Sequence, residues 1–354
     1  MPELRLNIVT KEWVIIAPGR ASRPTDHAPA FGTTLPPFNP RCPFCPGNES
    51  MTPSELMRLD SPNSATTPAA DHPGESAESS TNRSSWLTRV VDNMYPVLVQ
   101  STRNAVHSHD GLMHTVDGFG VHEVIIETPQ HNSCLALLDQ RQLEAIVRTY
   151  RDRYNACSRN PIVQHIVLFK NHGAGAGTSL EHPHAQIVGT PVVSHQVRDR
   201  IRALEEHLAL YGECVLCRMV DEEIRQESRI LHLSDSFVAF VPYAALSRYH
   251  IWIYPRRHSA HFGCVVDSEL SDLASTLRTV LRQLHFGLGD PAFNFVVRSA
   301  PRNCTNEGFH WYLSIVPRIG QAAGFEFGSG IYVNTSYPEE SAAFLRSVDT
   351  SDSR

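Results

Sequence analysis

The sequence predicts an α+β protein in which one structural unit occurs twice. Each copy has an apolar strand ending at a histidine, an amphipathic helix, a second strand, a turn, and a third strand that begins at another histidine. The strands read VHEVIIETPQH, QHIVLFKN and HAQIVGTP in the first copy and YHIWIYPRRH, FNFVVRS and HWYLSIVPR in the second. The interval is 51 residues from His131 to His182 and 52 residues from His258 to His310. Matching order and matching spacing indicate an internal duplication.

The helix of each copy follows from the spacing of its apolar residues. Side chains three or four positions apart lie on one face of an α-helix. This pattern holds for Leu143, Ile146, Val147, Tyr150 and Tyr154 in the first copy, and for Leu270, Leu273, Leu277, Val280, Leu281 and Leu284 in the second. A third amphipathic helix, expected over 195–211, would join the halves.

The chain is therefore expected to divide into an N-terminal half, 1–194, and a C-terminal half, 195–347. Residues 59–85 are rich in Ser, Thr, Ala and Pro without an apolar period, which predicts a long surface loop. Residues 348–354 are expected to form a frayed tail.

Composition excludes several classes of protein. The 354 residues are 41% hydrophobic, which is enough for a core, and their formal charge of −6 argues against binding nucleic acid through its phosphates. The apolar runs are too short to span a bilayer, and the first residues carry charges where a signal peptide needs an apolar core. We expect a soluble, cytoplasmic protein without a nucleic-acid or membrane partner.

Four of the eight cysteines form two C-x-x-C pairs, Cys42 with Cys45 and Cys214 with Cys217. Without a secretory signal, disulfides are not expected. A thioredoxin-like redox motif would follow a strand and open a helix, whereas the prolines around the first pair favour a tight knuckle that binds zinc. The remaining cysteines have no paired spacing and are interpreted as ordinary thiols: Cys134, Cys157, Cys264 and Cys304.

Two cysteines supply half of a tetrahedral zinc site, so each pair needs two further ligands. A C-x-x-C precedes each copy, and the histidines that bracket the copy are the candidates. The predicted sites are Cys42, Cys45, His131 and His182 in the first half, and Cys214, Cys217, His258 and His310 in the second.

The stretch EHPHAQIVG places two histidines at the start of a strand. Residues two apart on a strand point to the same face, so His182, His184 and Gln186 share one face. The preceding run HGAGAGTSL supplies glycines whose backbone N–H groups can approach a phosphate. It is not a dinucleotide-binding fingerprint, because Thr178 stands where the third glycine belongs and a strand follows. It is not a P-loop either, because Gly-Lys-Ser/Thr is missing.

These motifs resemble the galactose-1-phosphate uridylyltransferase family, a branch of the histidine-triad superfamily. The resemblance rests on CPFCPGNE, KNHGAGAGTSLEHPHAQ and the duplicated layout, and it extends over nearly the whole chain. It implies duplicated histidine-triad-like half-barrels with a mostly antiparallel sheet and packed helices. It assigns zinc to the first four predicted ligands, the covalent nucleophile to His184, and a hydrogen bond to the transferred phosphoryl group to Gln186.

The resemblance also implies substrate contacts. They are Arg20 and Arg23 for phosphate charge, Asn93 in the nucleotide pocket, Asn171, Gly177 and Ser179 along the phosphate path, and Phe325 and Glu326 at the hexose. Without the resemblance, the arginines fit surface charges and Phe325 fits a core position.

The implied activity is transfer of UMP from UDP-glucose to galactose 1-phosphate through a nucleotidyl-histidine, in a homodimer whose pockets are shared between subunits. A neutral imidazole can attack the α-phosphorus without a strong base. The second set of zinc ligands departs from the best-studied uridylyltransferases and resembles the ADP-glucose phosphorylase branch, which passes the nucleotide to inorganic phosphate. A zinc-stabilised nucleotide-binding protein without turnover is the alternative of another class.

Only the first half is expected to be catalytic. Alignment of His182 with His310 places Tyr312 opposite His184 and Ser314 opposite Gln186. A phenol is mostly protonated near neutrality and is a poor nucleophile. The run SAPRNCTNEG also replaces the glycine-rich turn. The second half should therefore serve as scaffold.

Overall fold

A computed structural model describes residues 1–22, 35–61, 86–103, 106–304, 307–320 and 322–351. The main sheet contains β3 (Glu55–Asp60), β4 (Trp86–Asp92), β7 (Val121–Ile126), β8 (His165–His172), β9 (His184–Thr190), β10 (Ile230–Leu233), β11 (Phe237–Phe240), β12 (Ile251–Pro255), β13 (Phe293–Arg298) and β14 (Tyr312–Pro317). Two smaller sheets contain β1 (Glu3–Leu6), β2 (Trp13–Ile16) and β15 (Tyr332–Asn334), and β5 (His107–Asp110) with β6 (Met113–Val116). The helices are α1 (Gln140–Ser158), α2 (His195–Tyr211), α3 (Val215–Gln226), α4 (Asp267–Leu288), α5 (Gly324–Ser329) and α6 (Pro338–Ser347).

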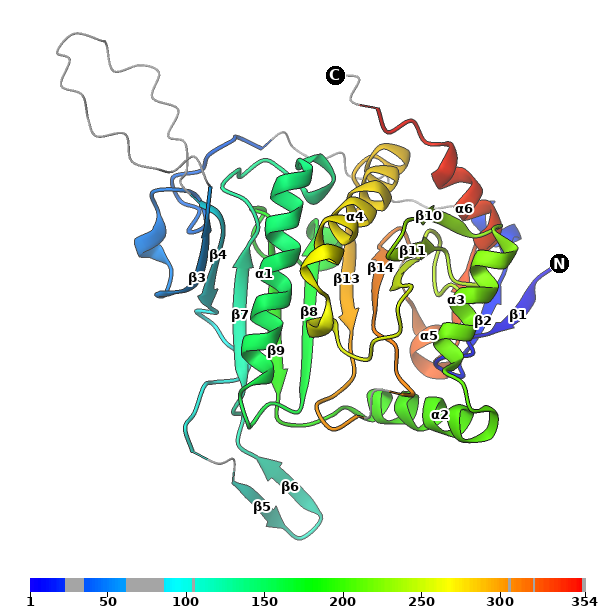
Figure 1. Cartoon of the computed structure of the whole chain (residues 1–354), viewed down its shortest axis with the longest axis horizontal. Helices are drawn as coiled ribbons and strands as arrows, with labels where there is room; N and C mark the ends of the chain where they lie inside the picture. Colours follow the sequence, from blue (N-terminus) through cyan, green and yellow to red (C-terminus); the bar gives the residue numbers. More distant parts are fainter. Residues whose placement is uncertain (23–34, 62–85, 104–105, 305–306, 321, 352–354) are drawn as a thin grey trace.

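The main sheet consists of two equivalent halves. From their junction at β8 and β13, the strands run outward as β8-β9-β7-β4-β3 on one side and β13-β14-β12-β11-β10 on the other. Every neighbouring pair is antiparallel. In the chain, α1 joins β7 to β8 and α4 joins β12 to β13. The predicted α+β class and the duplication are confirmed, and the half-sheets merge into one continuous sheet (Figure 1).

The two long helices cover one face of this sheet side by side (Figure 1). The apolar stripes predicted from their sequences are buried, and they form one core with the strands beneath them. Asp139 caps α1 by accepting a hydrogen bond from the Gln142 backbone N–H at 2.8 Å. The Gln142 side chain donates to the carbonyls of Leu87 and Glu127, both at 2.7 Å, so this first turn is tied to the sheet. No helix in these described ranges is both long and apolar enough to cross a bilayer.

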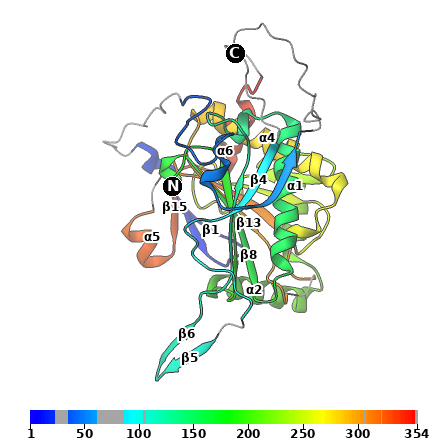
Figure 2. The same ribbon diagram turned by 90° about the vertical axis from the view of Figure 1, so that its left-hand side faces the viewer.

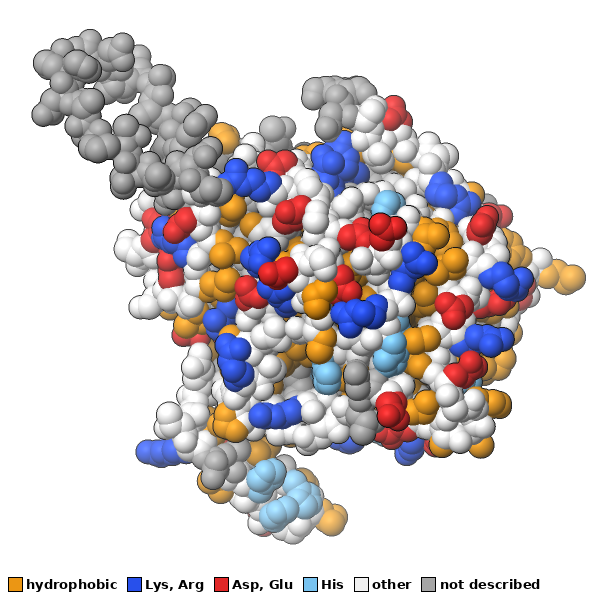
Figure 3. All heavy atoms as spheres, viewed as in Figure 1, with side chains coloured by type: hydrophobic (Ala, Val, Ile, Leu, Met, Phe, Trp, Pro, Cys, Tyr) orange, Lys and Arg blue, Asp and Glu red, His pale blue; other side chains and the backbone are white. Residues whose placement is uncertain are grey.

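Helix α2 runs below the ends of the strands and packs with the opposite face of β12 and β14, and the small β1-β2-β15 sheet lies on that side (Figure 2). The sheet is seen almost edge-on in Figure 2, with α1 on one side and α5 with β1 on the other. The predicted helix over 195–211 is confirmed: Ser194 caps its start and Gly212, at φ 69°, ends it. Positive and negative side chains are interspersed over α1 and α4, and histidines gather on the projecting β5–β6 hairpin (Figure 3).

Several predicted boundaries differ from the structure. The first strand ends at Ile126, five residues before His131, and its counterpart ends at Pro255, three residues before His258. Proline lacks the N–H that a sheet ladder requires, so Pro129 and Pro255 favour these strand ends. Leu59 and Asp60, expected in a loop, belong to β3, and the loop beyond 61 lies outside the described residues. In the tail, Arg282 donates to the Thr350 carbonyl.

A buried charged cluster fixes the first half-sheet around β8. Lys170 and Glu127 are 2% and 0% exposed and form an ion pair, and the Tyr150 hydroxyl donates to the same carboxylate. Lys170 Nζ also donates to the His184 carbonyl at 3.1 Å. One side chain therefore joins the helix–sheet core to the first residue of β9.

Replacement of Lys170 by methionine should lower the free energy of unfolding by about 3–5 kcal/mol, because Glu127 would be left as an uncompensated buried charge. Urea denaturation measures this change. The double variant Glu127→Gln/Lys170→Met removes both charges and should recover most of the loss. A loss below about 1 kcal/mol in Lys170→Met would contradict the role given to this pair.

Candidate functional site

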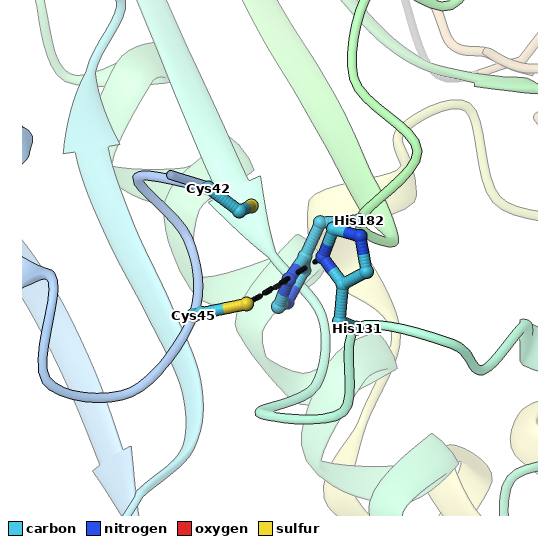
Figure 4. Close-up of side chains that lie close together, drawn as sticks. All are labelled: Cys42, Cys45, His131 and His182. Atoms are coloured by element: carbon cyan, nitrogen blue, oxygen red, sulfur yellow. Dashed lines mark hydrogen bonds between the residues drawn. The ribbon is translucent and has the colours of Figure 1, made fainter. Parts of the chain in front are cut away.

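The four ligands predicted for the first metal site meet at the start of β9 (Figure 4). The sulfurs of Cys42 and Cys45 and one ring nitrogen each of His131 and His182 lie within 4.8 Å of one another, and all four residues are buried. Cys45 Sγ is 3.5 Å from His131 Nδ1 and 3.7 Å from His182 Nδ1. Three chain segments that are distant in sequence therefore converge on one point.

The hydrogen bonds around this cluster fit a metal ion. His182 Nε2 lies 2.7 Å from the Thr128 carbonyl, which only accepts, so Nε2 carries the proton and Nδ1 turns its lone pair toward Cys45. Burial lowers the pKa of His182 to about 4 and raises the pKa of Cys45 to about 11. Buried thiols and neutral imidazoles around one centre suit zinc, and a carbonyl behind the histidine is its usual outer partner.

The second cluster is looser. Cys214, Cys217 and His258 have donor atoms within 4.8 Å of one another, with 3.1 Å between Cys217 Sγ and His258 Nδ1. His310 lies outside that three-residue group, although its Nδ1 is 3.4 Å from Cys217 Sγ. Here the C-x-x-C opens α3, a helix the sequence reasoning did not predict.

His184 begins β9 beside the first cluster and is 6% exposed. Its Nδ1 lies 2.8 Å from the His182 carbonyl, so Nδ1 carries the proton and Nε2 keeps its lone pair. Burial lowers the pKa of His184, which keeps the ring neutral near pH 7. The edge of the Phe44 ring packs against it at a centroid distance of 5.4 Å. The structure thus presents an oriented, uncharged imidazole nitrogen.

A hydrogen-bonded chain orients Gln186, and it includes His122, which sequence reasoning missed. The Val97 backbone N–H donates to His122 Nδ1 at 3.1 Å, so Nε2 carries the proton and donates to Gln186 Oε1 at 2.9 Å. Asn93 Oδ1 accepts from the Tyr95 backbone N–H at 2.8 Å, which leaves its Nδ2 to donate to the same Gln186 oxygen at 3.4 Å. The Gln186 amide nitrogen is left to donate to a ligand.

The sequence did hold a signal for His122. It occupies the second position of VHEVII, and His250 occupies the second position of YHIWIY. In the second half, His250 Nε2 lies 2.8 Å from Ser314 Oγ, where Ser314 replaces Gln186. The repeated histidine therefore marks a repeated contact.

The glycine-rich turn follows β8 next to this face. Gly173 and Gly177 have φ of 76° and 84°, which favour glycine, and a Cβ on Gly173 would lie 2.9 Å from the Ala292 side chain. Asn294 of β13 donates to Asn171 Oδ1 at 2.8 Å and to the Ala176 carbonyl at 2.9 Å. Asn171 therefore lies one residue before the end of β8, beside this turn, while Gly177 and Ser179 lie exposed on it.

Of the remaining predicted contacts, those in the described residues lie on elements other than β9 and the glycine-rich turn. Arg20 is exposed in the 3-10 turn Pro18–Ser22, and Arg23 lies outside the described residues. Phe325 and Glu326 lie in α5, on the second-half side of the molecule (Figure 1). Phe325 is 52% exposed, so a core position for it is wrong. Glu326 accepts from the Ala323 backbone N–H at 3.0 Å.

The position opposite His184 in the second half is filled. Tyr312 is 2% exposed, stacks on Tyr254 at a centroid distance of 4.7 Å, and packs on Trp252 at 5.1 Å. A cavity of about 530 Å³ does lie in this half, lined by residues that include Leu6, Tyr243 and Trp252. The histidine and glycine geometry nevertheless places the candidate site in the first half, because the cavity lacks a comparable nucleophile.

Comparison with known proteins agrees with this geometry. The family model for the galactose-1-phosphate uridyl transferase N-terminal domain matches residues 1–194, and a domain of unknown function, DUF4921, matches 127–346. ADP-glucose phosphorylase of Arabidopsis thaliana is 33% identical over 98% of this chain and 93% of its own length. Galactose-1-phosphate uridylyltransferase of Thermotoga maritima is 26% identical over 99% of both chains.

A solved structure shows that the similarity includes the fold. The crystal structure of the Arabidopsis thaliana ADP-glucose phosphorylase with bound ADP-glucose has a TM-score of 0.79 and 33% identity, and it covers 99% of this chain and 100% of the other. The matched family model spans more than half of the chain and contains the first Cys/His cluster, the glycine-rich turn and His184. The chain belongs to the galactose-1-phosphate uridylyltransferase family.

Proposed function

We propose that this nucleotidyltransferase takes a nucleotide from a nucleotide sugar onto His184 Nε2 and passes it to a phosphate-bearing acceptor. The orientation of His184 carries the proposal. Its Nδ1–H is engaged by the His182 carbonyl at 2.8 Å, so the lone pair of the neutral ring is on Nε2. A fixed imidazole lone pair is what nucleophilic attack on phosphorus requires.

The reaction proceeds in two displacements. In the first, the Nε2 lone pair attacks the α-phosphorus, the bond from that phosphorus to the bridging oxygen breaks, and the sugar 1-phosphate leaves with the electron pair. In the second, an acceptor phosphate oxygen attacks the same phosphorus and the N–P bond returns its electrons to Nε2. The imidazole ends neutral, so no outside reductant or base is consumed.

The groups around His184 meet the charge on the transferred phosphoryl oxygens. Gln186 offers its amide N–H because His122 and Asn93 occupy its oxygen. The glycine turn offers backbone N–H groups, and such pre-placed donors stabilise a phosphoryl transition state. We assign Arg20 and Arg23 to the same task, as implied by family resemblance.

We assign zinc to both Cys/His clusters in a structural role. Zinc bound by two thiolates carries no net charge, so when bound it fixes the ligands rather than activating a phosphate. In the first cluster the ligand His182 also supplies the carbonyl that orients His184. Cys42, Cys45 and His131 would thereby hold the start of β9.

The sequence identities to known proteins change which pair of substrates we propose first. The family resemblance of the sequence motifs implied UDP-glucose as the donor and galactose 1-phosphate as the acceptor. The identity of 33% to the plant ADP-glucose phosphorylase, against 26% to the Thermotoga maritima uridylyltransferase, supports ADP-glucose at least as well. The second Cys/His cluster favours the same branch. We therefore place adenylyl transfer from ADP-glucose to inorganic phosphate first and uridylyl transfer to galactose 1-phosphate second.

We also propose a homodimer in which α5 of one subunit reaches the other subunit's site. Helix α5, which carries the exposed Phe325 and its neighbour Glu326, lies on the second-half side of the molecule, whereas β9, which begins at His184, belongs to the first half (Figure 1). A pocket shared between two copies would bring the predicted hexose contacts to the nucleophile.

Initial rates with each donor and acceptor test the substrate assignment. ADP-glucose with inorganic phosphate should give ADP and glucose 1-phosphate faster than UDP-glucose with galactose 1-phosphate gives UDP-galactose. Chromatography of the products measures both reactions. A faster second reaction would instead establish the uridylyltransferase activity and reverse the order.

Incubation with ADP-glucose alone should release glucose 1-phosphate in an amount equal to the protein and add one nucleotide to its intact mass. His184→Asn should abolish the adduct, because the amide has no nucleophilic lone pair. Tyr312→Phe, the matched change in the other half, should leave the adduct intact. Turnover in the wild type without any adduct would eliminate the covalent route, and absence of both would support a non-catalytic binding protein.

His122→Ala should slow nucleotidylation by about 10- to 100-fold, because Gln186 could then turn its amide oxygen toward the phosphoryl group. The final amount of adduct and the zinc content should not change. A double-mutant cycle separates this role from general damage: Gln186→Ala should cost little more in the His122→Ala background. Fully additive losses would show that His122 does not act through Gln186.

Elemental analysis should find at least two zinc ions per chain, of which Cys42→Ser removes one and Cys217→Ser another. Loss of the first ion should lower stability by several kcal/mol, because structural metal binding is part of the folding free energy. Cys264→Ser changes an exposed cysteine and serves as control. An unchanged melting temperature in Cys42→Ser would refute the structural role.

A further inference from the structure

A third group of metal-type donors lies outside both predicted sites. It joins Cys134, which precedes the 3-10 turn Leu135–Leu137, His285 in the last turn of α4, and Asp290 just beyond that helix. Their sulfur, ring nitrogen and carboxylate oxygen lie within 4.8 Å of one another. His285 Nδ1 is 3.8 Å from Cys134 Sγ and 3.0 Å from Asp290 Oδ1. His172 Nε2 approaches the same carboxylate oxygen at 2.9 Å.

A small cavity lies among these side chains. Its volume is about 10 Å³, and all four of Cys134, His172, His285 and Asp290 line it. The rest of its wall is mostly apolar, from Leu135, Ala136, Leu281, Leu284, Pro291 and Phe293. A cavity of this size has room for about one water molecule, and therefore for a single ion. The cavity is therefore lined by the same side chains that supply the donor atoms.

Two other interpretations of this cluster account for fewer of its contacts. In a thiol–histidine–carboxylate triad, the nucleophile and the acid contact opposite nitrogens of the ring. Here Cys134 and Asp290 both face His285 Nδ1, so the triad geometry is absent. A simple ion pair accounts for Asp290 and the two histidines, but it makes no use of the Cys134 sulfur, which lies 3.8 Å from the same His285 nitrogen. Donor atoms of three kinds within 4.8 Å of one another, beside a cavity that their side chains line, are the arrangement expected around a shared ion.

We propose that Cys134, His172, His285 and Asp290 form a third metal site, which takes a divalent transition ion with affinity for sulfur and nitrogen, zinc foremost. One thiolate, two imidazoles and one carboxylate make a four-coordinate set of the kind zinc accepts. On binding, the Cys134 thiol and any protonated ring give up their protons to solvent. The thiolate and the carboxylate then offset both charges of the ion.

The location gives this site a mechanical consequence. His172 directly precedes Gly173, whose backbone packs against Ala292, two residues beyond Asp290. Cys134 follows the first-site ligand His131 by three residues. An ion here would join the end of β8, the end of α4 and the loop that leads to the first metal cluster. It would thereby stabilise the backbone of the glycine-rich turn.

Zinc titration of the chelator-treated full chain, against a chromophoric competing chelator, tests the site. The wild type should bind one more zinc ion than Cys134→Ser and one more than Asp290→Asn. Cys264→Ser, a cysteine change outside the three clusters, should match the wild type. Because the result is a difference between variants, loss of zinc from either Cys/His site, or failure of the proposed activity, would not be mistaken for it.

Cobalt identifies the ligand. The wild-type protein loaded with Co²⁺ should show more thiolate-to-metal absorption in the near ultraviolet than Cys134→Ser, by the contribution of one thiolate. Circular dichroism establishes that each variant is folded. If Cys134→Ser is unfolded, the comparison with Asp290→Asn, an exposed side chain, decides. Equal zinc uptake by the wild type and the folded variants would overturn the proposal.

Discussion

The hydrogen bond from His184 Nδ1 to the His182 carbonyl is the interaction on which the rest of the site depends. It determines that the ring lone pair of His184 lies on Nε2, and it does so only while the backbone at 182–184 stays in place. Three buried contacts hold that backbone. The His182 ring is fixed by the Thr128 carbonyl and faces Cys45, and Lys170 holds the His184 carbonyl from the helix side of the sheet. The first Cys/His cluster, the buried Lys170–Glu127 pair and His184 therefore form one unit.

The duplicated half contributes to this unit without repeating its chemistry. β13 pairs with β8, and Asn294 reaches from it to hold Asn171 and the glycine-rich turn. At the position equivalent to His184, Tyr312 stacks on Tyr254 and packs on Trp252, and its phenol is a poor nucleophile near neutrality. The second half retains the sheet, the helix pair and a Cys/His cluster, which suits a scaffold.

The sequence predicted what repetition and spacing can reveal. The two intervals of 51 and 52 residues predicted that side chains more than 80 residues apart, such as Cys45 and His131, would cluster, because both copies had to satisfy the same geometry. His122, Lys170 and the Cys134 cluster were missed because their roles come from contacts across strands and between helices. The spacing of residue types along the chain does not reveal such contacts. Phe325 and Glu326 were predicted by resemblance alone, and they lie in α5, on the second-half side of the molecule.

The attachment atom of the nucleotide tests the central claim most directly. Protein quenched with base after exposure to ADP-glucose should be digested, and the nucleotide-bearing peptide identified by mass spectrometry and phosphorus NMR. The account predicts a phosphoramidate on the peptide containing His184, joined through Nε2, because Nδ1–H is engaged by the His182 carbonyl. Attachment through Nδ1, or to another residue such as Tyr312, would contradict it.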